Sequence, residues 1–139
     1  MKIDARGMKF VYAVGATIAG TTDNYSAGID TKGYDGAIVL LQASLAAASA
    51  ELDTTVQEAG TNAGASFAHI AGCSFTQVTP TAATLAAQAG FIDLRKRKRY
   101  IRVRCKGDGT NLVGYSATVI LVSPKYLPAV ASATIKFSI

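Results

Sequence analysis

Apolar and polar residues alternate one by one along several short stretches of this chain. In residues 100–106, the side chains of Ile101, Val103 and Cys105 fall on one side, and a tyrosine and basic residues fall on the other. A period of two is typical of a β-strand with one buried face, whereas a helix could not separate these side chains. Residues 112–123 repeat the pattern, and they place five side chains inward: Val113, Tyr115, Ala117, Val119 and Leu121. Both stretches are therefore predicted to be strands.

Asp108 and Gly109 lie between these two predicted strands. Asp-Gly is a strong turn signal between alternating stretches, so the sequence predicts that the two strands pair as an antiparallel hairpin. The outer side of the second strand becomes apolar near its end, at Ile120 and Val122. We therefore expect that end of the strand to be covered on both sides.

Other short apolar stretches, separated by glycine-, asparagine- and aspartate-rich turns, add further strands. They are predicted at residues 8–14, 37–43, 52–58, 75–78, 91–94 and 134–139. Two alanine-rich stretches contain strong helix formers, but helices this short are marginal in water. Residues 45–51 are interpreted as a loop or strand edge, and residues 82–89 as one or two helical turns. No linker divides the chain, so we predict a single all-β domain over residues 1–139.

The composition agrees with a folded protein. Half of the 139 residues are hydrophobic, 17% are charged and the mean hydropathy is +0.26, which is too apolar for a disordered polypeptide. Charged residues interrupt every apolar run before the ~20 residues that a transmembrane helix needs. The first residues do not have the pattern of a cleaved signal peptide. We expect a soluble protein with no membrane partner.

The sequence offers no catalytic, cofactor or metal site, and we predict that the protein is not an enzyme. Cys73 and Cys105 lack the spacing of a metal motif, and the simplest interpretation is two small buried residues, although a disulfide between them stays open. His69 is the sole histidine, and nothing near it resembles a nucleophile motif. Residues 107–111 offer oxygen ligands for calcium but lack the further carboxylates such a site needs. No small-molecule substrate is expected.

The most distinctive feature is a cluster of cations, which largely accounts for the net charge of +5. Eight of the fourteen basic residues form this basic segment: Arg95, Lys96, Arg97, Lys98, Arg99, Arg102, Arg104 and Lys106. Three interpretations are open: docking on an acidic protein, a solvated edge that prevents strand aggregation, and binding of nucleic-acid phosphates. Tyr100 is the only aromatic residue in the segment, which disfavours nucleic acid because stacking partners are missing. We prefer docking on an acidic protein surface.

Several strand and turn motifs resemble those of a known family, the cement or decoration proteins that stabilise the heads of tailed bacteriophages. The motifs are residues 29–36 (Ile-Asp-Thr-Lys-Gly-Tyr-Asp-Gly), 55–58 with 67–72 and 75–79, and 99–103 with the strand 115–125. The similarity runs over roughly residues 25 to 126. The matching residues belong to strands and turns, so the resemblance concerns a fold and a structural role and supplies no active site.

The resemblance implies a jelly-roll-like antiparallel β-sandwich that assembles as a homo-oligomer, a dimer or trimer. Its partner would be the major capsid protein, whose neighbouring subunits it would clamp on the capsid exterior after synthesis in the host cytoplasm. Residues 1–7 and 128–139 would be extended arms. Small side chains permit close contacts between β surfaces, and an oligomer would account for the high hydrophobicity. Two alternatives stay open: a carbohydrate- or host-binding β-sandwich, and nucleic-acid binding through residues 95–106.

Overall fold

The computed structural model describes residues 7–18, 22–44, 50–79, 87–107 and 113–124. These residues form nine strands and two short 3-10 turns. The strands are β1 (Lys9–Ile18), β2 (Asp23–Tyr25), β3 (Ile29–Asp30), β4 (Tyr34–Ala43), β5 (Leu52–Ala59), β6 (Ala68–Ser74), β7 (Ala87–Asp93), β8 (Tyr100–Gly107) and β9 (Val113–Pro124). The turns are η2 (Gly64–Ser66) and η4 (Leu94–Lys96).

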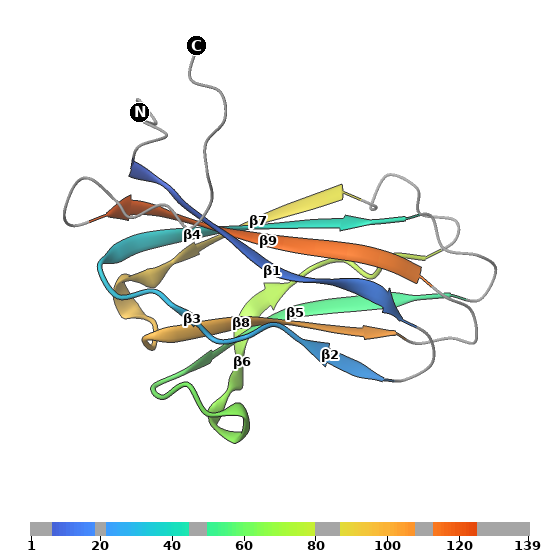
Figure 1. Cartoon of the computed structure of the whole chain (residues 1–139), viewed down its shortest axis with the longest axis horizontal. Helices are drawn as coiled ribbons and strands as arrows, with labels where there is room; N and C mark the ends of the chain where they lie inside the picture. The colour runs from blue at the N-terminus through green and yellow to red at the C-terminus, as the bar shows by residue number, and fades with distance from the viewer. Residues whose placement is uncertain (1–6, 19–21, 45–49, 80–86, 108–112, 125–139) are drawn as a thin grey trace, which may run out of the picture.

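The strands build two antiparallel sheets that pack face to face (Figure 1). One sheet has the order β1-β9-β4-β7, and the other has the order β2-β8-β5-β6, with β3 also paired to β8. Successive strands mostly change sheet, and the last strand, β9, lies beside the first. This is the order of a jelly roll, if β2 and β3 are taken as one interrupted strand. The predicted all-β, jelly-roll-like sandwich is confirmed.

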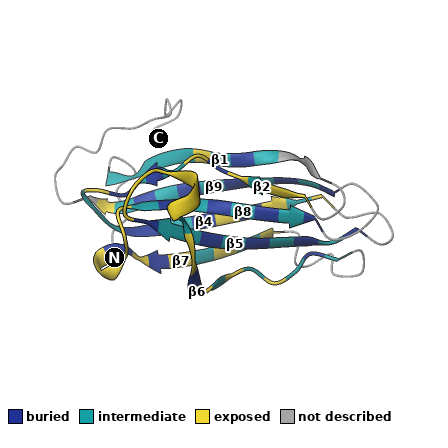
Figure 2. Cartoon of the chain, turned by 90° about the horizontal axis from the view of Figure 1, so that it is seen from below, coloured by how far each residue is buried: buried dark blue, intermediate teal, exposed yellow. Residues whose placement is uncertain are grey.

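The core lies between the two sheets and is built from the inward side of each alternating strand. Figure 2 shows the resulting change between buried and less buried residues along β8 and β5. Val39 on β4, Val56 on β5, Val103 on β8 and Val119 on β9 are almost fully buried in this layer. Removing such side chains from water is the main force that holds the sheets together. The inward residues predicted for the strands 100–106 and 112–123 are all buried.

The predicted hairpin is wrong, because β8 and β9 lie in different sheets. Strand β8 pairs with β2, β3 and β5, whereas β9 pairs with β1 and β4. Residues 108–112 lie outside the described ranges. Five residues can reach at most about 17 Å, which exceeds the roughly 10 Å between packed sheets, so the connection is long enough to cross. A turn signal therefore does not fix whether the next strand pairs or crosses.

Two other local predictions are wrong. Residues 75–77 are not a strand, and Val78 forms only an isolated bridge with Leu52, because the strand in this region is β6. Residues 87–89, predicted as part of a helical turn, begin strand β7, since pairing with β4 overrides their alanine content. The strand predicted at 134–139 and nearly all of the predicted arms lie outside the described residues. They stay predictions, as does the single domain.

Candidate functional site

The basic turn, residues 95–99, lies at one end of the sandwich, where the chain passes from β7 to β8. Buried Leu94 anchors the turn, and the Asp93 carboxylate accepts a hydrogen bond from the backbone N–H of Arg95, which caps η4. All five basic side chains of the turn are exposed. The turn contacts β4 and is tied to β3 by an ion pair, so it is held against the sandwich.

Four members of the basic segment have a carboxylate partner on the protein itself. The pairs and their closest N–O distances are Arg95–Asp93 at 2.6 Å, Arg97–Glu58 at 3.6 Å, Arg99–Asp30 at 2.7 Å and Arg104–Asp23 at 2.7 Å. The hydrogen bonds from Arg99 lower the pKa of the Asp30 carboxyl, and those from Arg95 lower the pKa of Asp93. Exposed pairs of this kind stabilise a fold only slightly, but they fix the direction in which each side chain points.

The remaining cations of the segment are Lys96, Lys98, Arg102 and Lys106. Their side chains form no salt bridge within the described residues. The backbone N–H of Lys98 donates a hydrogen bond to the Glu58 carboxylate at 3.0 Å. The segment therefore retains a positive surplus after its internal ion pairs, and the two exposed lysines of the basic turn carry half of it.

Arg102 has a different environment, because its guanidinium lies between two aromatic rings. Its central carbon is 4.2 Å from the centre of the Tyr25 ring and 4.4 Å from the centre of the Phe67 ring. Its Nε donates to the Gln57 side chain at 2.7 Å. A cation held over ring faces gains electrostatic attraction at both. Arg102 therefore joins β2, β5, β8 and the loop before β6, which is a structural role within the outer face.

Close packing around Gly28 supports this arrangement. A side chain at Gly28 would collide with the Asn62 carboxamide and touch the Phe67 ring at 3.0 Å. The loop between β5 and β6 therefore lies directly on the segment between β2 and β3. Tyr25, Phe67 and Gln57 were not predicted from the sequence as partners of Arg102. No local signal could have found Tyr25 and Phe67, because they become neighbours only when β2, β8 and the loop come together.

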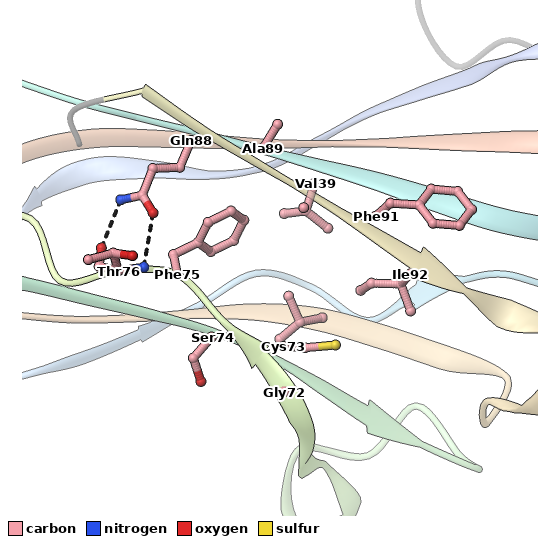
Figure 3. Close-up of a pocket in the computed structure, with 12 residues that line it drawn as sticks. Val39, Gly72, Cys73, Ser74, Phe75, Thr76, Gln88, Ala89, Phe91 and Ile92 are labelled. Carbon is pink, nitrogen blue, oxygen red and sulfur yellow. Dashed lines mark hydrogen bonds between the residues drawn. The ribbon is translucent and has the colours of Figure 1, made fainter. Parts of the chain in front are cut away.

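A small pocket opens between the edges of β6 and β7, the edge strands of the two sheets (Figure 3). Val39, Val56, Phe75 and Ile92 are among its lining residues, and its volume is about 270 Å³. At its rim, the Gln88 carboxamide accepts a hydrogen bond from the Thr76 N–H and donates one to the Thr76 carbonyl, at 2.9 and 2.7 Å. No charged side chain lines the pocket, and its polar groups come from Cys73, Ser74, Thr76 and Gln88.

Titratable groups outside the basic segment do not assemble into a reactive site in the described part of the chain. Among those residues, no group of three or more His, Cys, Asp or Glu could hold a metal ion. His69 is exposed on β6, opposite Gln57 of β5. Cys73 and Cys105 are both free thiols, and Cys105 is fully buried whereas Cys73 is partly exposed. Burial raises the pKa of both thiols, that of Cys105 to about 11, which opposes nucleophilic reactivity.

Comparisons with known proteins agree on the fold. No protein-family model matches the sequence, and no curated protein matches it. Among solved structures, the crystal structure of PBSX exported protein XepA has a TM-score of 0.62 and 12% identity, over 99% of this chain and 46% of that one. The infectious bursal disease virus VP2 subviral particle has a TM-score of 0.54 and 9% identity, over 87% of this chain and 33% of that one.

At these identities the likeness establishes a shared β-sandwich and nothing about binding. This chain spans less than half the length of either of those chains. Within the described residues, no helix is both long and apolar enough to cross a membrane. The fold thus defines a jelly-roll β-sandwich protein, of an architecture also found in PBSX exported protein XepA and in the infectious bursal disease virus VP2 subviral particle.

Proposed function

We propose that this chain is a structural virion protein that docks on the outer surface of a phage capsid and bridges neighbouring major capsid subunits. The observation that carries the proposal is the basic turn, which presents five consecutive exposed cations at the end of a packed sandwich. Lys96 and Lys98 have no salt-bridge partner among the described residues, so their charges can meet an acidic surface. The resemblance to cement proteins supports the same role, and the sandwich fold shared with the VP2 subviral particle is compatible with it.

Weak contacts suffice for such a role, because a capsid repeats the same surface many times. Exposed charges attract a partner at a distance and raise its rate of association, but each contributes little affinity. Several contacts made at once by one particle convert small affinities into tight binding. Buried Leu94 and the Asp93 cap of η4 anchor the turn on the sandwich, which reduces the ordering that docking would otherwise require.

The two alternative functions have less support. A carbohydrate site needs exposed ring faces, and the Arg102 guanidinium already covers one face of Tyr25 and one of Phe67. For nucleic acid, the only aromatic residue of the basic segment is Tyr100, whose ring lies 5.1 Å from the Arg99 guanidinium. Neither arrangement leaves a free row of rings on the face of β2, β8 and β5, and the exposed rings of Tyr12 and Phe91 lie on the other sheet.

Co-sedimentation with assembled phage heads that lack the protein tests the proposal. We expect the wild-type chain to pellet with heads in a fixed ratio at about 50 mM salt, and to dissociate at about 500 mM, because salt screens exposed charges. The double variant Lys96→Ala/Lys98→Ala should bind at least about tenfold more weakly, since two of the uncompensated charges are lost.

A matched control separates the position of the charges from the net charge. The variant Thr22→Asp/Ala71→Glu lowers the net charge by the same two units at exposed positions away from the turn. It should bind heads nearly as well as the wild type does. If wild-type protein does not pellet with heads at low salt, the proposal is wrong. If both double variants lose binding equally, net charge and not the basic turn accounts for docking.

A further inference from the structure

The outer face of the β2-β8-β5-β6 sheet carries one row of three side chains that can all donate hydrogen bonds. The strand registers place Arg102 of β8 opposite Gln57 of β5, and Gln57 opposite His69 of β6. Residues directly opposite one another on paired strands share a face of the sheet. Arg102 and Gln57 are half-buried on this face, and His69 is exposed. We call these three residues the donor row.

Most donors of the donor row have no partner among the described residues. The Nε of Arg102 donates to Oε1 of Gln57 at 2.7 Å, but neither Nη of Arg102 forms a hydrogen bond or an ion pair there. Because Gln57 accepts this bond with its oxygen, its amide N–H groups stay available. The His69 ring also has no hydrogen-bond partner within the described ranges. The row therefore presents several unused donors side by side.

Arg102 is held in a different way from the other arginines of the basic segment. Each of those places an Nη on a carboxylate of the chain: Arg95, Arg97, Arg99 and Arg104. Arg102 is held by the rings of Tyr25 and Phe67 instead. Ring faces attract a guanidinium and fix its position, but they do not cancel its charge or use its Nη hydrogens. Arg102 is therefore a fixed cation that the described part of the protein leaves uncompensated.

We infer that the donor row binds a carboxylate, supplied by an Asp or Glu side chain of a partner protein. Gln57 occupies the Nε side of the Arg102 guanidinium, so the two Nη atoms form its open edge. Their two parallel N–H groups match the two oxygens of a planar carboxylate. A phosphate dianion would need a second fixed cation for charge balance, and the row holds only Arg102. The inference does not rest on capsid docking, because it uses none of the charges of the basic turn.

The site also has the preorganisation that a specific contact needs. A long arginine side chain that is free in solution must be ordered when it binds, and this ordering opposes binding. In Arg102 the two rings and the hydrogen bond to Gln57 have already ordered the side chain. A carboxylate therefore meets a guanidinium that is already in place, whereas the exposed lysines of the basic turn offer only screened point charges.

Titration of the isotope-labelled full chain with the capped peptide acetyl-Gly-Asp-Gly-amide tests the site by NMR at about 20 mM salt. We expect saturable shifts of the Arg102, Gln57 and His69 side-chain signals, with a dissociation constant of about 1–10 mM, since a single carboxylate contact is weak. The neutral peptide acetyl-Gly-Asn-Gly-amide should bind at least about tenfold more weakly, because it lacks the charge and the second carboxylate oxygen. Inorganic phosphate, titrated in parallel, should bind no more tightly than the Asp peptide does.

The substitution Gln57→Glu removes the site while Arg102 and its ring contacts stay. It puts a carboxylate of the same size next to Arg102, so affinity for the Asp peptide should fall at least about tenfold while circular dichroism shows an intact fold. Gln42→Glu makes the same change of charge at an exposed position of the other sheet and should bind as the wild type does.

Three outcomes would overturn the inference. The first is a wild-type protein whose donor-row signals do not shift saturably with the Asp peptide. The second is Gln57→Glu binding the peptide as tightly as the wild type does, or Gln42→Glu losing as much affinity as Gln57→Glu, because general charge would then account for binding. The third is inorganic phosphate binding at the row more tightly than the Asp peptide, which would assign the site to phosphate groups.

Discussion

The two outer faces of this sandwich use opposite chemistry on the same architecture. The face of β2, β8 and β5 presents charged and polar side chains that are tied together, with Arg102 between two rings and Arg104 paired with Asp23. The outer face of β1, β9, β4 and β7, which we call the apolar face, holds no charged residue in three successive rows of strand partners, and Tyr12, Leu40 and Phe91 are exposed on it. A jelly roll can therefore present two outer faces of different chemistry, one charged and polar and one without charge.

The largest expected effect concerns β8, whose alternation separates the core from the polar face. Cys105 lies on the inward side of β8, and burial raises its pKa to about 11, whereas Cys73 is partly exposed on β6. Near pH 8, we expect a thiol reagent to modify Cys73 at least about 100-fold faster than Cys105 in the folded protein, because the thiolate reacts. Mass spectrometry of partly labelled protein measures both rates. Equal rates would mean that β8 does not face the core as described.

The same shift predicts how stability depends on alkaline pH. The folded protein holds the Cys105 proton more tightly than the unfolded chain does, since its pKa is raised from the ordinary 9.0. The free energy of unfolding should therefore fall as the pH rises from about 9 to about 11. Cys105→Ala should remove most of this alkaline loss, whereas Cys73→Ala should remove less.

The next largest effect tests the polar face. Arg102→Ala should lower the free energy of unfolding by about 2 kcal/mol, because two ring contacts and the hydrogen bond to Gln57 are lost together. Lys96→Ala, at an exposed position of the basic turn, should change it by less than about 0.5 kcal/mol. Urea unfolding measures the free energy of unfolding of both variants. If the two variants are equally stable, Arg102 does not join the strands of this face.

A glycine substitution tests the packing on the apolar face. Gly36→Ala should cost about 1–2 kcal/mol, because the new methyl group would lie 2.9 Å from both the Phe91 ring and a Val122 methyl. Gly60→Ala is the matched control, since a Cβ there would meet nothing within 4 Å. Thermal unfolding of Gly36→Ala and Gly60→Ala measures the difference in stability between the two variants. A Gly36→Ala variant as stable as Gly60→Ala would show that Phe91 does not lie over β4.

The smallest expected effect concerns an ion pair that fixes the basic turn. Asp30 accepts two hydrogen bonds from Arg99 and one from the backbone of Lys32. Asp30→Asn should cost about 0.5–1 kcal/mol at neutral pH. The pKa of Asp30 is lowered from 3.8, so its contribution is present above that pH and is lost as the pH falls through the folded-state pKa. The difference between wild type and variant should therefore narrow under acid conditions. A difference that does not change with pH would contradict this assignment.

Sequence patterns predicted elements better than they predicted neighbours. The alternation in residues 100–106 correctly predicted which side of β8 is buried. Ile120 and Val122 led us to expect that the end of β9 is covered on both sides, but on the outer side both residues are only half-buried. The predicted hairpin between β8 and β9 was wrong because the pairing of a strand depends on which other strands are available beside it. The alternation of side chains shows which face of a strand is buried, but it does not show which strand is its neighbour.

The surfaces were predictable only in part. The basic segment was recognised from its composition, but its internal ion pairs were not. Asp30 and Arg99 are 69 residues apart, and Asp23 and Arg104 are 81 apart, so only the folded sheets bring them together. The apolar face was hidden for the same reason, since Phe91 and Ile38 share a row only once β7 pairs with β4.

The stability of heads with and without the protein tests the proposed role most directly. Purified heads that lack the chain should disrupt at a higher temperature after it is added in stoichiometric amount, and adding Lys96→Ala/Lys98→Ala at the same concentration should give a smaller increase. Heads that bind no protein and disrupt at an unchanged temperature would contradict a role in bridging capsid subunits.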